Sequence, residues 1–467
     1  MRFSAVVACV LLSTVAQAAE APRIGPASSA DAILAARPRV EPALELTYDV
    51  KGGSQPGTIT LDLAPDFAIV TRDRELVIYD YLLRRLITLN DKAHSFTNMS
   101  LYGLVDVLVA ETFNRRMQHQ LLKGVNLSQG AALMDPFWVQ SELHVMDPQD
   151  STPSIDRRTD PNGSVHFLYG GKEVASYLPS KQVMTPDEAA RLKKMLRYAT
   201  QMHPIIIDDI GASGFVPQRL AFENPPMWKK PASEWTLQSA VPVRAVIPLR
   251  PGDKPALPPL PDSVAPLIPV MAAAKAGQAP DHRTVDDYRA AIEKSVGANP
   301  FQALVYALEA SLQFGQQVLE CPDTAKCHSL KQVFQMAERD PRAAIVLRAL
   351  SPHSKEELEQ AIKELRAMKR DDLSNAYVLD DWLANSLVES GQVEPALPLF
   401  VSAIKGNPYM AGYYKDIGDA FRFSFQPDRA WLFYDMGREI PGSNAAPVVA
   451  QWNAYEAQLA QTHPEFF

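Results

Sequence analysis

The feature that most constrains the fold of this chain is a pattern near the C-terminus that recurs after 34 residues, as from Leu383 to Ile417. The two copies consist, in chain order, of Asp380, Leu383, Ala384, Leu387, Ala396, Phe400 and Pro408, and of Tyr414, Ile417, Gly418, Phe421, Ala430, Tyr434 and Pro441. Each copy is long enough for two helices joined by a turn. Because one such hairpin cannot bury its apolar face alone, the pattern predicts helical hairpins that stack on one another.

These copies resemble the tetratricopeptide repeat family, in which bulky, small and aromatic residues alternate over two helices and a proline closes each unit. The second copy follows the family pattern throughout, with Gly437 as its last small residue. The first copy has Asp380 at a position that is usually bulky, and Trp382 is a candidate to fill that volume. Residues 300–369 match only as helices of suitable length, and we expect them to supply further, degenerate hairpins.

The resemblance implies a function in binding. In this family the first helices of the hairpins line a concave surface that holds a protein or peptide partner. The residues of this chain that would face such a partner are Asp381, Asn385, Val388, Lys415, Asp419 and Arg422. Their charged and amide groups suit contacts with a peptide. The alternative is that these residues form an ordinary solvated helix face.

The N-terminus has the features of a secretory signal. Arg2 precedes an apolar run from Ala5 to Val15, and small residues suited to cleavage end at Ala18. Residues 1–18 are therefore predicted to be a signal peptide that is removed near Ala18, and residues 19–42 a flexible leader. This predicts a periplasmic or secreted protein. No later apolar run reaches the roughly 20 residues that a transmembrane helix needs.

Two cysteines, Cys321 and Cys327, follow the signal and are separated by five residues. In an oxidising compartment this pair predicts a disulfide. The spacing does not match the closer C-x2-C pairs of zinc sites, so no metal is expected.

The charge of the chain argues against one class of partner. Acidic residues outnumber basic residues by 54 to 46, which gives a formal net charge of -8. Because nucleic-acid binding depends on a basic surface that neutralises phosphates, nucleic acid is not expected as a partner.

Residues 43–247 are predicted to form an α+β domain with an antiparallel sheet. From Leu44 onward, apolar and polar residues alternate in short runs that are separated by turn residues. A helix is expected from about Ser100, with an apolar stripe that packs on the sheet; a membrane-surface role for this helix is the alternative. A second helix should begin at Thr185, where a proline and Glu188 complete a capping pattern. The last predicted strands span residues 205–207, 215–222 and 235–247.

Proline becomes frequent after this domain, which predicts an extended, semi-rigid linker over residues 248–283. Residues 284–467 then read as an all-α domain of tetratricopeptide-like helical repeats. A last helix from about Asn444 to Ala460 is expected to cover the open end of the stack, because terminal repeats need a cap.

The favoured function is that of an exported protein that binds or scaffolds protein or peptide partners through its helical repeats. The sequence contains no recognised catalytic, phosphate-binding or metal-binding motif, so neither an enzyme nor a cofactor is predicted. The strongest acidic pair, Asp208 and Asp209, follows a predicted strand, where adjacent side chains point to opposite faces. A carrier of an apolar ligand or lipid is the second hypothesis, since the layout of the first domain loosely resembles that of periplasmic lipoprotein or lipid carriers. An uncharacterised enzyme is the third.

Overall fold

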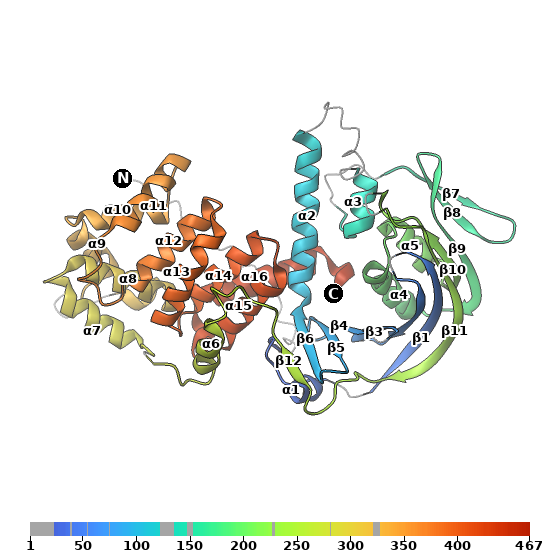
Figure 1. Cartoon of the computed structure of the whole chain (residues 1–467), viewed down its shortest axis with the longest axis horizontal. Coiled ribbons are helices and arrows are strands. Elements are labelled where there is room, and N and C mark those ends of the chain that lie inside the picture. Colours follow the sequence, from blue (N-terminus) through green and yellow to red (C-terminus); the bar gives the residue numbers. More distant parts are fainter. Residues whose placement is uncertain are drawn as a thin grey trace.

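The structure is a computed structural model of the chain. It describes residues 23–37, 40–53, 55–73, 75–121, 135–146, 153–226, 229–280, 282–320 and 327–467. A curved sheet with its own helices forms one half of the molecule, and a stack of helices forms the other half (Figure 1). This arrangement confirms the predicted order of an α+β region followed by an all-α region.

The sheet contains twelve strands within the described residues, in the spatial order β12-β6-β5-β4-β3-β2-β1-β11-β10-β9-β8-β7. The strands are β1 (Glu41–Gly52), β2 (Gly57–Leu63), β3 (Phe67–Arg72), β4 (Glu75–Asp80), β5 (Arg85–Asn90), β6 (Ser95–Ser100), β7 (Ile155–Thr159), β8 (Val165–Tyr169), β9 (Lys172–Val183), β10 (Phe215–Phe222), β11 (Ser233–Ala245) and β12 (Lys254–Ala256). Neighbouring strands run antiparallel, as predicted, except for the parallel pair of β12 and β6. Among the described strands, the sheet is therefore mixed only at this edge.

Strand β1 shows why the alternating pattern produces this sheet. Its alternate apolar side chains are all buried: Leu44, Leu46, Tyr48 and Val50. Successive side chains of a strand point to opposite faces, so this spacing places all four on the same, inner face. Strand β1 pairs with β11 along its whole length, from Glu41 opposite Ala245 to Gly52 opposite Ser233. This pairing joins the first six strands to the strands that follow α2.

In the part of the chain that the structure describes, five helices accompany the sheet: α1 (Ala30–Ala35), α2 (Leu101–Leu121), α3 (Pro136–Leu143), α4 (Pro186–Ala199) and α5 (Pro204–Ala212). Helices α4 and α5 lie inside the curve of the sheet (Figure 1). The predicted start of α4 is confirmed, because the Thr185 and Glu188 side chains each accept a hydrogen bond from the other residue's backbone N–H. Leu192, Met195 and Leu196 of α4 are fully buried against the sheet.

Residues 205–207 form part of α5, and the prediction of a strand there was wrong. The helix starts at Pro204, whose fixed φ angle suits a first helical position. The Nδ1 atom of His203 accepts a hydrogen bond from the backbone N–H of Ile205 at 3.3 Å and caps the helix. A short apolar run fits a buried strand and a buried helix equally well, so the three isoleucines alone could not distinguish a strand from a helix. Asp208 and Asp209 consequently lie on a helix.

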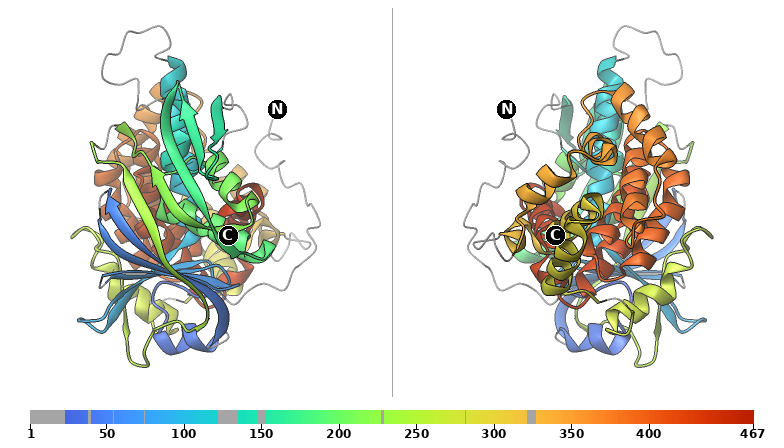
Figure 2. Two further views of the ribbon diagram at one scale, coloured as in Figure 1. Left: turned by 90° about the vertical axis from the view of Figure 1, so that its right-hand side faces the viewer. Right: turned by 90° about the vertical axis from the view of Figure 1, so that its left-hand side faces the viewer.

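Helix α2 packs on the sheet as predicted at its start, where Leu101 is buried in the core of the sheet, but its other contacts differ from the prediction. Its first turns are buried, and there it packs against the helices α15 and α16 of the stack. A Cβ atom on Gly103 would lie 3.0 Å from the Trp431 ring, so the close crossing of α2 and α15 favours glycine at this position. Later apolar residues of the predicted stripe, such as Phe113 and Met117, are exposed. Both side views show α2 standing between the sheet and the stack (Figure 2).

The leader and the linker are more structured than predicted. The predicted signal peptide, residues 1–18, lies outside the described residues. Within the predicted flexible leader, residues 30–35 form α1, and β1 begins at Glu41. Within the proline-rich segment, β12 pairs with β6, and a helix buries Leu267 and Met271 in the core of the stack. The segment is therefore packed on both halves of the molecule instead of separating them.

The stack consists of α6 (Leu267–Lys275), α7 (Val285–Val296), α8 (Pro300–Phe314), α9 (Leu330–Ala337), α10 (Pro341–Leu350), α11 (Lys355–Ala367), α12 (Tyr377–Glu389), α13 (Val393–Gly406), α14 (Ala411–Phe423), α15 (Pro427–Glu439) and α16 (Pro447–Thr462), with short 3-10 turns at Gln316–Leu319, Ser443–Ala445 and Pro464–Phe466. Helices α12 and α14 begin 34 residues apart, at 377 and 411, and so do α13 and α15, at 393 and 427. The predicted hairpins and the last helix are therefore present.

Matched small and bulky side chains hold these hairpins together. Ala396 and Ala430 are completely buried, as expected for the close approach of paired helices. A Cβ atom on Gly418 would lie 2.4 Å from the ring of Tyr434, so the two helices of the second hairpin touch where the sequence supplies a glycine. Gly437 takes the same role toward α16, since a Cβ there would lie 3.2 Å from Trp452.

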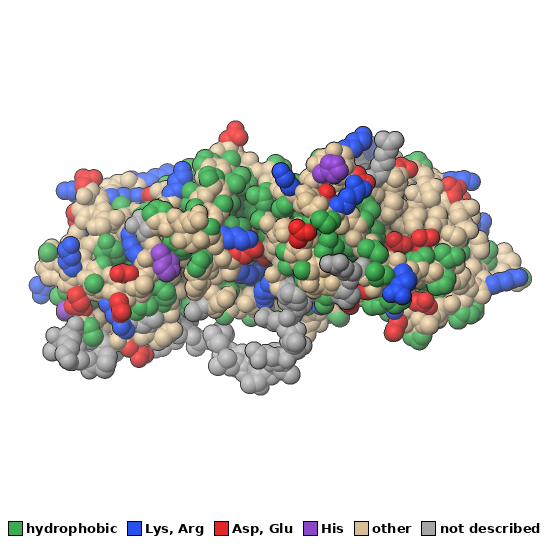
Figure 3. Space-filling model, turned by 90° about the horizontal axis from the view of Figure 1, so that it is seen from below, with side chains coloured by type: hydrophobic (Ala, Val, Ile, Leu, Met, Phe, Trp, Pro, Cys, Tyr) green, Lys and Arg blue, Asp and Glu red, His purple; other side chains and the backbone are tan. Residues whose placement is uncertain are grey.

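The surface carries charges of both signs. On the face seen in Figure 3, basic side chains lie among acidic ones, and hydrophobic side chains show between them near the middle of the molecule. In the part of the chain that the structure describes, no helix has both the length and the apolar character needed to span a membrane.

Candidate functional site: an apolar groove beside the second repeat

The residues predicted to line a binding surface are engaged with one another. Asp381 is 1% exposed and accepts a hydrogen bond from Asn385, which also donates to Asp416, each at 3.2 Å. Lys415 forms ion pairs with Asp416 and Asp419. The first helices of the two hairpins are thus joined by a chain of polar contacts. Four of the six predicted residues therefore belong to one internal network.

Burial changes the proton affinity of this network. Burial, followed by the charge of Asp416, raises the pKa of Asp381 well above its usual range. Burial also raises the pKa of Asp416, although Lys415 opposes this rise. A buried and a partly buried carboxyl group that share one asparagine are easier to accommodate when one of them keeps its proton. The network therefore suits a structural role between the hairpins.

The other two predicted residues lie apart from this network. Val388 is partly buried and packs against the core of the stack. Arg422 crosses to the first half of the molecule, where it donates two hydrogen bonds to the carboxylate of Asp106 on α2, both at 2.7 Å. It also donates to the hydroxyl of Tyr455 at 2.7 Å. This paired, fork-like contact fixes α2 against α14 and neutralises the buried carboxylate.

A groove of about 480 Å³ opens directly beside the contact between Arg422 and Asp106. It lies between α2 on one side and the turn from α14 to α15, with α16, on the other. Its apolar lining comprises Val107, Val109, Ala110, Phe113, Phe423, Phe425 and Pro427, and its polar lining comprises Asp106, Asn114, Arg422 and Tyr455. The charges of Asp106 and Arg422 cancel, so the groove presents a mainly apolar surface.

Three aromatic rings of the groove are unusually open to solvent. The exposed fractions are 51% for Phe113, 63% for Phe423 and 45% for Phe425. On α2 the apolar face continues beyond the groove through Met117 and Leu121, at the helical spacing of four residues. Single exposed apolar residues are common on proteins, but a cluster beside a groove is typical of an interaction site.

The backbone of Phe425 is also strained. The preceding hairpin has Gly391 at the same position, 34 residues earlier, with a φ of 82°. Phe425 adopts the same left-handed conformation, with a φ of 55°, although its side chain makes that conformation costly. The turn is closed in both hairpins by the same hydrogen bonds, from Gln392 to Leu387 and from Gln426 to Phe421. The second repeat therefore has a strained, half-exposed phenylalanine at a position where glycine would adopt the same backbone conformation at lower energetic cost.

Sequence reasoning missed the aromatic residues of the groove. A signal was present in the segment from Phe421 to Phe425, which has three phenylalanines in five residues at a turn between helices. Only Phe421 occupies a packing position of the repeat. The contribution of α2 could not be found in the same way, because it depends on contact between the two halves.

The remaining site predictions are only partly covered by the structure. Cys321 lies outside the described residues, so its disulfide with Cys327 stays a prediction. Within the described ranges, no cluster of three His, Cys, Asp or Glu side chains is arranged to hold a metal ion.

Comparisons with family models, with curated proteins and with solved structures find no match to this chain.

Proposed function

We propose that the exported chain binds a partner protein by accepting a short apolar segment of that partner in the groove between α2 and the turn from α14 to α15. The observation that carries this proposal is the strained and half-exposed Phe425, which lies with Phe113 and Phe423 in one groove. Local strain of about 1–3 kcal/mol is retained in proteins mainly where function needs it.

The shape and charge of the groove favour an apolar peptide segment as the occupant. The groove lies open along α2, so a segment of a larger molecule can enter it. Among the described residues that line the groove, the one acidic and the one basic side chain are paired with each other at 2.7 Å, so these residues offer no free charge to a charged ligand. An amphipathic helix that inserts apolar side chains between two helices is a common solution to such a surface.

The helical repeats remain the binding element, but the partner contacts their edge beside α2 instead of the helix face that the sequence predicts. The predicted face contributes Arg422, which orients α2 and forms part of the groove. The carrier hypothesis has less support, because α4 and α5 occupy the concave face of the sheet, where an apolar ligand would have to lie (Figure 1).

Selection of peptides from a displayed random library, with the full chain as bait, tests the proposal. We expect the selected peptides to carry aromatic or aliphatic residues three or four positions apart. Their binding should fall at least about tenfold in the variants Phe423→Ser and Phe113→Ser, since a buried aromatic contact contributes roughly 1.5–3 kcal/mol.

The matched control is Phe215→Ser, which removes an exposed aromatic ring from strand β10, far from the groove in the chain. This variant should bind the selected peptides as the unmodified chain does. Peptides whose binding survives both groove substitutions would contradict the proposal. Peptides whose binding depends instead on Asn385 or Lys415 would show that the binding surface is the helix face that the sequence predicts.

A further inference from the structure

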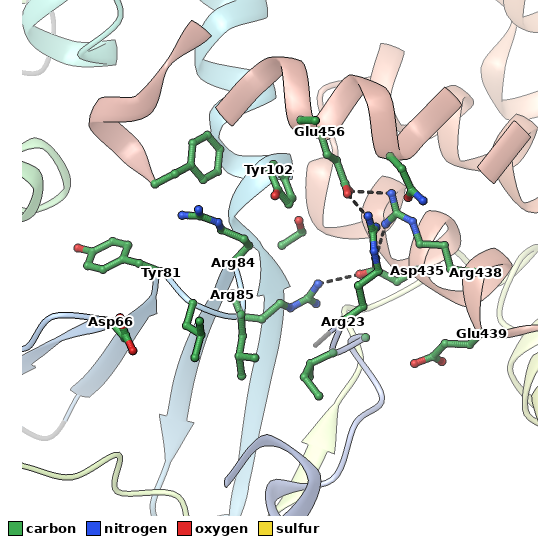
Figure 4. A pocket seen from close by; sticks show the side chains of 18 of the residues that line it. Arg23, Asp66, Tyr81, Arg84, Arg85, Tyr102, Asp435, Arg438, Glu439 and Glu456 are labelled. Atoms are coloured by element: carbon green, nitrogen blue, oxygen red, sulfur yellow. Dashed lines mark hydrogen bonds and ion pairs between the residues drawn. The ribbon is translucent and has the colours of Figure 1, made fainter. Parts of the chain in front are cut away.

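Several charged side chains are paired with one another where the sheet meets the stack. A cavity of about 550 Å³ lies at this junction (Figure 4). Arg85 and Arg438 both pair with the carboxylate of Asp435, at 2.7 and 2.8 Å. Glu456 pairs with Arg438 at 2.9 Å. These charges therefore join the two halves of the molecule, whereas two charges at the opposite end of the sheet are not used in this way.

Strand β7 forms that opposite edge of the sheet. It is the last strand in the spatial order and, among the described strands, pairs only with β8. In Figure 1 the hairpin of β7 and β8 projects from the end of the molecule that lies farthest from the stack. An edge strand has backbone N–H and C=O groups with which a further strand can pair. The other edge, β12, is less suited to pairing because it has only three residues and contains Pro255.

The turn after β7 shows which backbone groups of the strand face outward. The Asp160 N–H donates to the carbonyl of Ser164 at 2.9 Å, so the backbone groups of Asp160 are directed toward β8. These groups alternate between the two sides of a strand. Those of Ile155, Arg157 and Thr159 are therefore directed away from β8, where they can form hydrogen bonds with a further strand.

The outer face of β7 has one charge of each sign, on Asp156 and Arg158. Both side chains are exposed, and neither has a hydrogen bond or an ion pair with another described residue. His166 lies opposite Arg158 on β8. The carboxylates of Asp160 and Glu173 contact the ring of His166, at 3.2 and 3.1 Å, and not the guanidinium of Arg158. Two opposite charges thus remain available on this face.

The inner face of β7 has a charge that is already neutralised. The Nε atom of Arg157 donates to the carboxylate of Asp209 on α5 at 2.8 Å, and its Nη1 atom donates to the hydroxyl of Thr159 at 3.0 Å. Ile155 and Thr159, which share this face, are β-branched and suit a strand. Arg157 can therefore lie at the centre of an interface without contributing an unpaired charge.

We propose that β7 pairs antiparallel with β7 of a second copy of this chain, about a two-fold axis at Arg157. In this register Asp156 of each copy lies opposite Arg158 of the other copy. Ile155 likewise lies opposite Thr159. The pairs of residues 156 and 158 are of the non-hydrogen-bonded type, in which opposite side chains lie closest, so each forms an ion pair. The two-fold axis uses the same surface on both copies, and this strand is complementary to itself in charge and in backbone hydrogen bonding.

The order of the charges selects this register. Charges on an edge strand commonly prevent pairing, because equal charges come to face each other. A two-fold axis at Asp156 or at Arg158 would have this effect, whereas an axis at Arg157 brings opposite charges together. The paired strands are short, so we expect weak association with a dissociation constant between about 1 μM and 1 mM.

Sedimentation velocity of the full chain over a range of concentrations tests this assignment. We expect a dimer that weakens at about 1 M salt, where the screening length falls to about 3 Å. The variants Asp156→Lys and Arg158→Glu should each associate at least about tenfold more weakly, because the two-fold axis makes each substitution break two ion pairs.

A mixture of these two variants separates charge pairing from damage to the fold. In a mixed pair, the substituted position 156 of one copy faces the substituted position 158 of the other with opposite charge. Equal amounts of the two variants should therefore form a dimer again. The control variant is Lys181→Glu, which reverses an exposed charge on β9 and should leave the association unchanged. Circular dichroism establishes that each variant is folded.

An unmodified chain that stays monomeric at about 0.5 mM would overturn the proposal. Association that both single substitutions leave intact would also overturn it, and so would a mixture of the two variants that stays monomeric. Association that is lost in Phe423→Ser but kept in Arg158→Glu would place the interface in the apolar groove instead. None of these outcomes requires the groove to bind a peptide, so this test is independent of the proposed function.

Discussion

At the scale of single residues, the backbone of Phe425 can be compared with that of Gly391. They occupy the same turn in consecutive hairpins and have the same left-handed backbone, but only one of them is glycine. The cost at Phe425 is of order 1–2 kcal/mol. The ring recovers part of this cost through its buried half, yet 45% of it stays exposed in the groove.

Replacing Phe425 with glycine should therefore separate stability from binding. Relief of the left-handed strain and loss of the half-buried ring oppose each other, so we expect the free energy of unfolding to change by less than about 1 kcal/mol. Binding of a groove peptide should fall severalfold. Urea titration and peptide affinity measure the two effects.

The matched control is Gly391→Ala, which adds a side chain at the equivalent position, where nothing lies within 4 Å. Only the strain remains there, so this variant should lose about 1 kcal/mol of stability and keep its peptide affinity. A large stability loss in Phe425→Gly would show that the ring is a core residue and not a binding residue.

Lys194 predicts a dependence of stability on pH. Its folded-state pKa of about 8 lies below the ordinary value of 10.5, so the unfolded chain binds more protons between these values. The free energy of unfolding of the unmodified chain should therefore rise, relative to Lys194→Met, as the pH increases from 8 to 10.5. Denaturant titrations of both proteins across this range measure the difference. A constant difference would mean that Lys194 is not desolvated.

At the scale of secondary-structure elements, the crossing of α2 and α15 determines whether the groove exists. The crossing favours glycine at position 103, because a Cβ atom there would lie 3.0 Å from the Trp431 ring, closer than most side-chain contacts. Asp106, one turn later, then reaches Arg422.

The substitution Gly103→Val should force these helices apart. We expect a loss of about 1–3 kcal/mol in the free energy of unfolding, because the extra atoms have no space to occupy. Peptide binding in the groove should weaken at the same time. Gly297→Val is the control, since a Cβ at that helix end would meet nothing within 4 Å, and its cost should stay below about 1 kcal/mol. Equal losses of stability in the two variants would contradict a special role of Gly103 at the crossing of α2 and α15.

The elements that the sequence predicted well are those set by local patterns. Alternation along β1, the capping residues of α4 and the period of the last hairpins each depend on neighbours in the chain. The helix α5 was missed because three consecutive isoleucines carry no periodicity. The groove was missed because its two sides, near Phe113 and Phe423, are more than 300 residues apart in the sequence.

At the scale of the whole molecule, the two halves are joined as one body. Phe466 follows the last helix of the stack, yet it is completely buried against Val105 of α2 and Val145. The hydroxyl of Tyr198 on α4 donates to the carbonyl of Phe466 at 2.7 Å. The proline-rich segment was expected to separate two domains, but its helix α6 is buried in the stack and its strand β12 extends the sheet.

We therefore expect both halves to unfold in a single transition. Circular dichroism of the helices and fluorescence of the tryptophans, which include Trp235 in the sheet and Trp431 in the stack, should give the same midpoint in denaturant. The variant Phe466→Ala should lower the stability by about 3–5 kcal/mol, whereas the exposed Phe423→Ala should change it by less than about 1 kcal/mol. Two separated transitions in the unmodified chain would contradict this expectation.

The most direct test of the central claim is photo-crosslinking from position 423. A photoreactive phenylalanine analogue replaces Phe423 in the full chain, and mass spectrometry identifies the residues to which it attaches in cells that produce the protein. The groove predicts attachment to an apolar segment of a protein partner from position 423 and none from the control position 215. Attachment only from the helix face at position 385, with none from position 423, would contradict it.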